Sequence, residues 1–305
     1  MQESKFIWMN GLVVPWNESN PHFLSHALHY GSAVFEGIRC YNTKKGPAVF
    51  RLDDHIERLF NSANIFGMTI PYTKDEIICA TKNMVVQNNL SECYIRPLAY
   101  YSSGGLGFDV TKQKVDVGVA AWAWGAMLGA ESIVNGIKLK ISPFKRPSAE
   151  FMPVNAKVSG NYANSIMAKM DAVRTGYDDA VMLDANGTVA ECSAENFFMI
   201  KNNVLITPTK ENCLDGITRK SIMEIASENG YAVEEKKIRP EDLFSADECF
   251  ICGTAAEIVP VTSISMTSIG TGKRGTITKF IQEEYSKAIH GETEKYSKWL
   301  TFVNP

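Results

Sequence analysis

The chain has 305 residues and a formal net charge of -3; 45% of its residues are hydrophobic and 21% are charged. This length suits two domains better than one, and the small net charge without a long basic run excludes the electrostatic signature of a nucleic-acid-binding protein. The N-terminus lacks a secretion signal, no stretch approaches the ~20 apolar residues of a membrane span, and the seven cysteines are scattered, so we expect no membrane partner, reduced thiols and a cytoplasmic location.

The N-terminal part begins with a pattern typical of a hairpin. Residues 5–15 predict a strand pair around a turn at Asn10 and Gly11. His26 and His29 could suggest a metal, but no third ligand lies nearby in the sequence and the chain has only five histidines. We therefore expect no metal site.

Helices and a strand are predicted next. A helix begins near Arg51, because the apolar residues of this stretch fall on one helical face (Leu52, Ile56, Leu59, Phe60 and Ala63). Arg58 lies off that face, where an ordinary solvated arginine also lies. After a second helix at about 74–88, alternation predicts a strand at 93–101 in which Tyr94 and Arg96 project to the same side. We expect a first domain at 1–123, a connector at 124–135 and a second domain at 136–305.

The second half alternates between helix and sheet. Strand patterns with intervening turns predict an antiparallel meander over 179–207, which places Glu191 on a sheet. A helix is predicted to run from about 217 to 229, and unpaired amides at its start (Gly216, Ile217 and Thr218) can hold an anion. The small-residue turn at 253–256 can also offer backbone donors, and a last helix is predicted at 276–289.

Lys157 is the candidate catalytic amine. It lies between an apolar approach at 151–154 and the start of a helix that Gly176 ends, so we expect it to be partly desolvated. Desolvation lowers an amine's pKa from ~10.4 and makes the neutral form, which attacks carbonyls, accessible. From its type alone Lys157 reads as a surface lysine, but Gly160 could allow a close approach to a ligand and Tyr162 places a phenol five residues away.

Several segments together resemble a known family. The segments Lys157–Tyr162 (KVSGNY) and Glu191–Phe198 (ECSAENFF) are similar to the lysine and glutamate segments of the branched-chain amino acid aminotransferases. The resemblance extends through further motifs in family order: Tyr30-Gly31, Phe35–Arg39 (FEGIR), Tyr94–Pro97 (YIRP), Gly216–Arg219 (GITR) and Gly253–Glu257 (GTAAE). It therefore spans most of the chain.

The resemblance implies a fold, a cofactor and a reaction. It implies an α+β protein of fold type IV, with a small N-terminal α/β sandwich domain and a larger C-terminal pseudo-barrel domain. It also implies pyridoxal 5'-phosphate and transamination of leucine, isoleucine and valine with 2-oxoglutarate. In this family pattern Lys157 bonds to the cofactor and moves the proton, Glu191 holds the ring nitrogen, Arg58 binds the phosphate and Tyr162 meets the 3'-oxygen, with the remaining cofactor contacts at Gly216, Ile217, Thr218 and Thr254.

The substrate pocket is implied in the same way. Tyr94 and the backbone of Thr254 and Ala255 would bind the α-carboxylate, and the rest of the pocket is assigned to Tyr30, Phe35, Gly37, Arg39, Arg96 and Trp124. Met127 replaces a tyrosine that several relatives carry, which removes one phenol. Fold type IV relatives are at least dimers, so we expect a homodimer or larger.

Alternative functions remain open from the sequence. A D-amino-acid aminotransferase or an aminodeoxychorismate lyase would use the same lysine and glutamate, although the motifs at 35–39 and 94–96 argue against both. A non-catalytic binding protein could also retain the scaffold. The visible absorption of a bound cofactor, and the amino acid that bleaches it, would separate these functions.

Overall fold

A computed structural model describes residues 2–125 and 129–304. The described residues form two compact units. The first contains residues up to Gly125 together with Ala156–Asn161 and Ala288–Pro305; the second contains 162–287 and the described part of 126–155. The expected boundaries differ from this division in two places, because the Lys157 segment and the C-terminal stretch belong to the first unit. Among the described residues, no helix is long and apolar enough to span a membrane.

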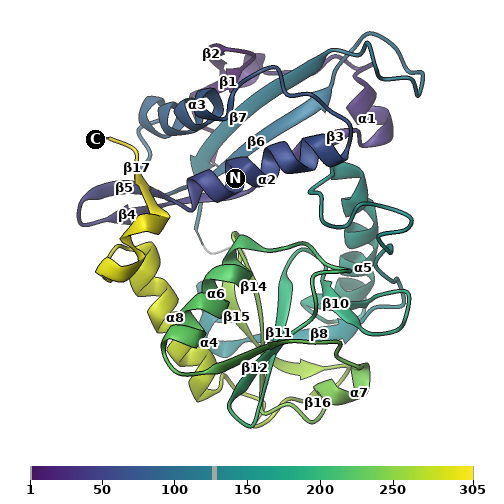
Figure 1. Cartoon of the computed structure of the whole chain (residues 1–305), viewed down its shortest axis with the longest axis vertical. Helices are drawn as coiled ribbons and strands as arrows, with labels where there is room; N and C mark the ends of the chain where they lie inside the picture. Colours follow the sequence, from purple (N-terminus) through teal and green to yellow (C-terminus); the bar gives the residue numbers. More distant parts are fainter. Residues whose placement is uncertain (1, 126–128, 305) are drawn as a thin grey trace. The chain divides into compact units, whose positions relative to one another are not determined.

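The first unit is built on an antiparallel sheet with the strand order β17-β5-β4-β6-β7-β1-β2, and β3 pairs with β6. The predicted hairpin at 5–15 and the predicted strand at 93–101 are confirmed. Figure 1 shows β17 beside β5, although these strands come from opposite ends of the chain. The strands are β1 (Phe6–Met9), β2 (Leu12–Pro15), β3 (Ala33–Phe35), β4 (Ile38–Thr43), β5 (Gly46–Phe50), β6 (Cys93–Tyr101), β7 (Val115–Ala123) and β17 (Leu300–Phe302).

Helices α2 (Leu52–Ile65) and α3 (Lys74–Gln87) belong to the first unit and provide one side of its core (Figure 1). Both helices were predicted, and α3 begins with a capping box between Thr73 and Glu76. Ile95 and Ala99 of β6 join the apolar cluster that contains Ile56 and Leu59 of α2. Because side chains alternate along a strand, Tyr94 and Arg96 lie on the other side of β6. The shorter helices of this unit are η1 (Trp16–Glu18), α1 (His26–Tyr30), η2 (Ser159–Asn161) and η3 (Glu294–Trp299).

The Lys157 segment is joined to β3 and α1 of the first unit. Val158 forms a bridge with Val34, and the Gly160 amide donates to the Gly31 carbonyl at 3.0 Å. A Cβ on Gly31 would lie 2.7 Å from the Gly160 Cα, and Gly31 has φ 65°, so this crossing requires glycine. The close approach predicted at Gly160 is therefore found, but it is an approach to backbone.

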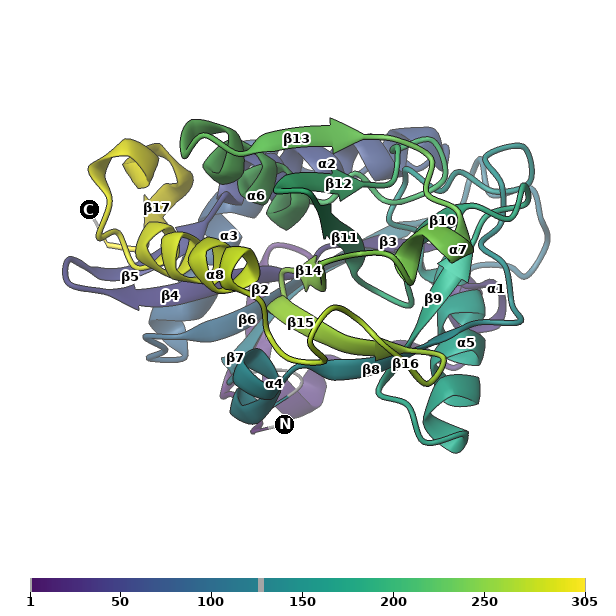
Figure 2. The ribbon, with the colours of Figure 1, turned by 90° about the horizontal axis from the view of Figure 1, so that it is seen from below.

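The second unit is built on a mixed sheet with the order β10-β9-β8-β15-β14-β11-β12-β13. Strand β8 is parallel to both β9 and β15, and β12 is parallel to β13. In Figure 2 the sheet curls from β8 and β15 through β14 and β11 to β12 and β13. The strands are β8 (Ile137–Ile141), β9 (Asp179–Leu183), β10 (Val189–Cys192), β11 (Asn196–Lys201), β12 (Val204–Thr207), β13 (Ala232–Glu235), β14 (Glu248–Gly253), β15 (Glu257–Ile264) and β16 (Thr267–Ser268), which pairs with β15.

The meander predicted over 179–207 is confirmed as the antiparallel pairs β9–β10 and β11–β12, and Glu191 lies on β10. The predicted helices at 217 and 276 are also found. The helices of this part are α4 (Ala130–Asn135), α5 (Tyr162–Arg174), α6 (Ile217–Glu228), α7 (Pro240–Leu243) and α8 (Thr276–Ile289), whose last residues belong to the first unit.

Candidate active site

The candidate site residues are divided between the units. Lys157, Arg58 and the predicted pocket residues Tyr30 to Arg39, Tyr94, Arg96 and Trp124 belong to the first unit. Glu191, Tyr162, Gly216–Thr218 and the turn at 254–255 belong to the second. Each group is described within its own unit. Met127 lies outside the described residues.

Lys157 is held at its backbone from two sides. Its amide donates to the Ser62 hydroxyl of α2 at 3.0 Å, and its carbonyl accepts from the Phe35 amide of β3 at 3.1 Å. The amine Nζ lies 4.9 Å from the centre of the Phe35 ring. Lys157 is half-buried, as the sequence predicted. An amine on an anchored backbone and beside an aromatic face has a restricted range of positions from which to attack a carbonyl.

Arg58 pairs with a buried carboxylate. Its Nε and Nη2 donate to Glu36 Oε1 and Oε2 at 2.6 and 2.9 Å, and His55 Nδ1 lies 2.7 Å from Oε2. Burial would raise the pKa of Glu36, but Arg58 and His55 beside it hold that pKa well below its usual range. Burial lowers the pKa of His55, so its imidazole is neutral and donates Nδ1–H to Glu36.

The sequence did not identify Glu36 and His55 as partners of Arg58. Glu36 lies inside the motif at 35–39, and His55 lies three residues before Arg58 on α2. Helical spacing places residues three apart on neighbouring positions of one face, so a search for polar residues near Arg58 would have found His55. The strand partner Glu36 depends on long-range packing.

The structure brings together the aromatic and basic residues of the predicted pocket. The Arg96 guanidinium lies 4.8 Å from the Phe35 ring centre and 5.4 Å from that of Tyr94, and Nη2 donates to Tyr94 Oη at 3.3 Å. The Tyr94 and Trp124 ring centres are 5.3 Å apart. A Cβ on Gly37 would lie 1.8 Å from Tyr94 Oη, so the tyrosine occupies the space that only glycine leaves.

Two further predicted pocket residues have other neighbours. Arg39 is buried and pairs with Glu92 at 2.9 Å, and its guanidinium lies 5.0 Å from the Tyr41 ring centre. Tyr30 is 45% exposed, and its ring centre lies 5.1 Å from that of Phe108. Arg39 therefore has an acidic partner, and Tyr30 lies on an exposed aromatic surface.

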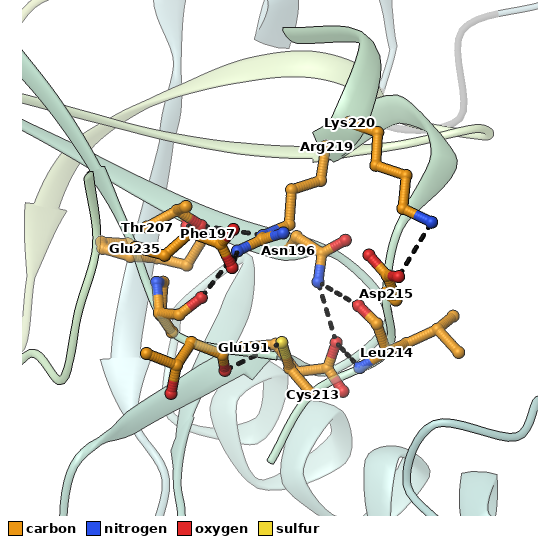
Figure 3. Close-up of polar contacts among 12 residues, drawn as sticks. Glu191, Asn196, Phe197, Thr207, Cys213, Leu214, Asp215, Arg219, Lys220 and Glu235 are labelled. Carbon is orange, nitrogen blue, oxygen red and sulfur yellow. Dashed lines mark hydrogen bonds and ion pairs between the residues drawn. The ribbon is translucent and has the colours of Figure 1, made fainter. Parts of the chain in front are cut away.

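Glu191 is a buried carboxylate with several donors. Its Oε2 accepts from Asn196 Nδ2 and from the Leu214 amide, both at 3.3 Å (Figure 3). Its Oε1 pairs with Arg146 Nη2. Arg146 is itself buried and donates through Nη1 to the Ser165 hydroxyl at 3.1 Å. These contacts fix the carboxylate as an anion, and the sequence had not singled out Arg146.

A second buried carboxyl group supports the turn after Glu191. Glu195 and Asp179 are both buried, and Lys169 Nζ lies 2.9 Å from Asp179 Oδ2. Burial, followed by the charge of Asp179, raises the pKa of Glu195 to about 8. At neutral pH Glu195 is therefore protonated, and it accepts the Ala194 amide at 3.1 Å.

Helix α6 begins where the sequence predicted an anion site. Gly216 is its N-cap residue, and no side chain caps the first turn. A Cβ on Gly216 would lie 1.9 Å from Asn196 Oδ1, so the chain must be glycine here. Arg219 lies behind the first turn, where it pairs with Glu235 at 2.7 Å and Thr207 at 3.2 Å (Figure 3). The first amides of α6, including those of Ile217 and Thr218, are therefore suited to an anion.

The remaining predicted residues of the second unit flank these elements. Tyr162 is half-buried at the first position of α5. Thr254 and Ala255 form the turn between β14 and β15, directly after Gly253. Side chains and backbone amides of this unit thus provide an anionic partner at Glu191 and donors at Gly216–Thr218.

Comparison with known proteins identifies the family. The model of the amino-transferase class IV family matches residues 33–264. The chain belongs to the class IV aminotransferases. A branched-chain-amino-acid aminotransferase from Pseudomonas aeruginosa is 45% identical over 97% of both chains, and that of Escherichia coli K12 is 42% identical over 99% of both.

Solved class IV aminotransferases have the same fold. The Escherichia coli branched-chain amino acid aminotransferase superposes with a TM-score of 0.97 at 42% identity, covering 99% of this chain and 100% of the other. A thermophile branched-chain amino acid aminotransferase, whose source is abbreviated T.th., was solved with pyridoxamine 5'-phosphate and gives a TM-score of 0.97 at 44% identity over 100% of both chains. The predicted family and the α+β, fold type IV architecture are confirmed.

Proposed function

We propose that this class IV aminotransferase transfers the amino group of leucine, isoleucine and valine to 2-oxoglutarate, giving branched-chain 2-oxo acids and L-glutamate. The observation that carries the proposal is the anchored Lys157 amine, held between Phe35 and Ser62 in a chain of this family. Relatives with this printed activity are 42–45% identical over nearly the whole chain. This identity favours the branched-chain reaction over the D-amino-acid and lyase alternatives.

The cofactor that fits the donors of this chain is pyridoxal 5'-phosphate. Glu191, kept anionic by Arg146, suits a protonated ring nitrogen, and the uncapped start of α6 suits a phosphate. When bound, the cofactor supplies an electron sink for the Cα–H bond of the substrate. The T.th. relative was solved with the pyridoxamine form, which supports this choice.

The residues of this chain would divide the work as follows. Lys157 Nζ bonds to the aldehyde carbon and later carries the proton from the substrate Cα, which requires an amine that can be neutral. Glu191 accepts a hydrogen bond from the ring N–H. Arg58 and the amides of Gly216, Ile217 and Thr218 bind the phosphate, and Tyr162 donates to the 3'-oxygen, with Thr254 completing the contacts.

The substrate pocket must accept both an apolar side chain and the carboxylate of glutamate. Arg96 offers a way to do so, because its guanidinium lies over the Phe35 and Tyr94 rings and leaves an aromatic surface for leucine. Turned toward the ligand, the same guanidinium would pair with the distal carboxylate of 2-oxoglutarate. Tyr94 and the backbone of Thr254 and Ala255 would bind the α-carboxylate, and the wall is assigned to Tyr30, Gly37, Arg39, Trp124 and Met127.

A homo-oligomer is part of the proposal. Large apolar side chains are exposed in the first unit, among them Phe23, Leu28 and Phe108, and on helix α5 of the second, where Ile166 is 63% exposed. Exposed apolar groups of this size are typical of surfaces covered by another subunit. Burial of Cys40 and Cys192 as free thiols fits a reducing compartment such as the cytoplasm.

Visible absorption of the purified holoenzyme tests the function. We expect L-leucine to remove the visible cofactor band and 2-oxoglutarate to restore it, with release of L-glutamate. A D-amino acid that alone bleached the band would favour the D-amino-acid aminotransferase. A protein without a band, even after incubation with pyridoxal phosphate, would contradict the proposal and favour a non-catalytic role.

A further inference from the structure

Glu36 makes a two-bond contact with Arg58 at the junction of β3 and α2. Two roughly parallel bonds, Nε to Oε1 at 2.6 Å and Nη2 to Oε2 at 2.9 Å, join the groups. Glu36 is completely buried, and the Arg58 side chain is 14% exposed. A bidentate pair fixes both the position and the plane of a guanidinium, whereas a single bond leaves the plane free to rotate.

The Glu36 carboxylate is itself fixed by other groups. His55 donates to Oε2 at 2.7 Å, and the Gly37 amide donates to the same oxygen at 3.3 Å. Since His55 is neutral, the cluster of Glu36, His55 and Arg58 carries one negative and one positive charge. The contacts of Glu36 therefore neutralise Arg58 and orient it at the same time, and these two effects have opposite consequences for an anion.

The same junction anchors Lys157. The Phe35 amide, adjacent to Glu36 in the chain, donates to the Lys157 carbonyl at 3.1 Å. Ser62 lies one helical turn after Arg58 on α2 and accepts the Lys157 amide at 3.0 Å. A contact between Glu36 and Arg58 thus ties together the strand and the helix that hold Lys157.

We propose that Glu36 is a positioning residue that orients the Arg58 guanidinium for the phosphate of the cofactor and holds it in register with Lys157. The inference rests on the proposed function, since it takes the cofactor phosphate as the ligand of Arg58. Glu36 uses the Nε–Nη2 edge of the guanidinium, which directs the Nη1 side away from the carboxylate and fixes where an anion can meet it. Orientation outweighs the charge that Glu36 neutralises.

The sign of one substitution separates orientation from neutralisation. Glu36→Gln keeps the shape of the side chain but removes its charge and replaces one acceptor by a donor facing Arg58. If Glu36 only neutralised Arg58, its loss would strengthen phosphate binding by Coulomb attraction. If Glu36 orients Arg58, phosphate binding weakens, by about tenfold or more for a lost charge-assisted contact.

The experiment compares two ligands that differ only in the phosphate. Pyridoxamine 5'-phosphate and pyridoxamine are titrated into the full chain freed of cofactor, with tryptophan fluorescence as the signal. We expect Glu36→Gln to lower the affinity for the phosphorylated ligand about tenfold or more and to leave pyridoxamine within about twofold. Glu57→Gln is the matched control, because Glu57 lies next to Arg58 on α2 but pairs outward with Lys74; it should change neither affinity.

Other variants keep the test decisive. If Glu36→Gln does not fold, Glu36→Asp is measured in the same way, since it keeps the charge but shortens the reach, and we expect it to lose phosphate selectivity as well. An unchanged or increased preference for the phosphorylated ligand, or an equal loss for both ligands, would overturn the inference. Arg58→Lys tests the proposed function separately: if this variant keeps the full preference for the phosphate, Arg58 is not the phosphate ligand.

Discussion

Replacing Glu191 by glutamine should affect both stability and catalysis, for different reasons. The carboxylate pairs with Arg146, which is only 8% exposed and has the neutral Ser165 hydroxyl as its other side-chain partner. Glu191→Gln would leave the guanidinium buried without an anion. Breaking a buried ion pair on one side costs ~3–5 kcal/mol, which corresponds to a fall in Tm of about 10 °C for a unit of this size.

A second substitution separates the two effects. Arg146→Met in the Glu191→Gln background removes the unpaired charge and replaces it with an apolar side chain of similar length, so most of the lost stability should return. Catalysis should not return, because a neutral amide cannot hold the proton of the ring nitrogen as a carboxylate does. The coupling between the two sites should be on the order of 3 kcal/mol.

Calorimetry and single-turnover kinetics with L-leucine check this prediction in the wild type, both single variants and the double variant. Glu234→Gln is the control, since Glu234 is exposed and pairs with the exposed Lys236; its Tm should hardly change. Two results would refute the reasoning. An unchanged Tm for Glu191→Gln would mean that the buried pair does not stabilise the fold, and a recovered rate in the double variant would mean that Glu191 serves only to neutralise Arg146.

Three further outcomes are expected. Lys157→Ala should abolish the visible cofactor band and transamination, and retained turnover in a spectroscopic assay would disprove its role. Arg96→Met should cost ~2–5 kcal/mol in kcat/KM for 2-oxoglutarate and much less for leucine, since an unpaired carboxylate is lost only with the acceptor; equal losses would indicate general damage to the site. The pKa of Glu195 is raised from 4.5 to about 8. Its contribution to stability is therefore fully present below pH 4.5 and is lost as the pH rises to about 8, with a slope of at most ~1.4 kcal/mol per pH unit, and urea unfolding across this range should show a flatter dependence for Glu195→Gln.

Local patterns predicted many of the elements. Alternation placed β6, and with it Tyr94 and Arg96 on one face, because a strand of nine residues fixes its facing by period alone. The helical pattern located α2 within one residue at its start and placed α8 at its observed bounds. Both are long amphipathic segments, for which periodicity is most informative.

The partners of the site residues were not predictable in this way. The sequence placed Lys157 in the C-terminal domain, but its backbone bonds to Phe35 and Ser62 join it to the first unit across a long stretch of chain. Glu36 and Arg146 were not recognised because a charged residue is normally exposed, and only the packed structure reveals the buried partner that retains it. Resemblance identified the reacting groups, while the groups that orient them required coordinates.

The composition of the first unit has a consequence for how the protein is made. Strand β17 pairs with β5, and the Lys157 segment bridges to β3, so this unit includes residues 300–302 as well as the first strands. Multidomain chains commonly fold from the N-terminus as they leave the ribosome. Here the N-terminal sheet cannot reach its final pairing until translation has passed residue 302, and the second unit has all of its own strands before that point. The second unit should therefore be the first to complete its fold on the ribosome.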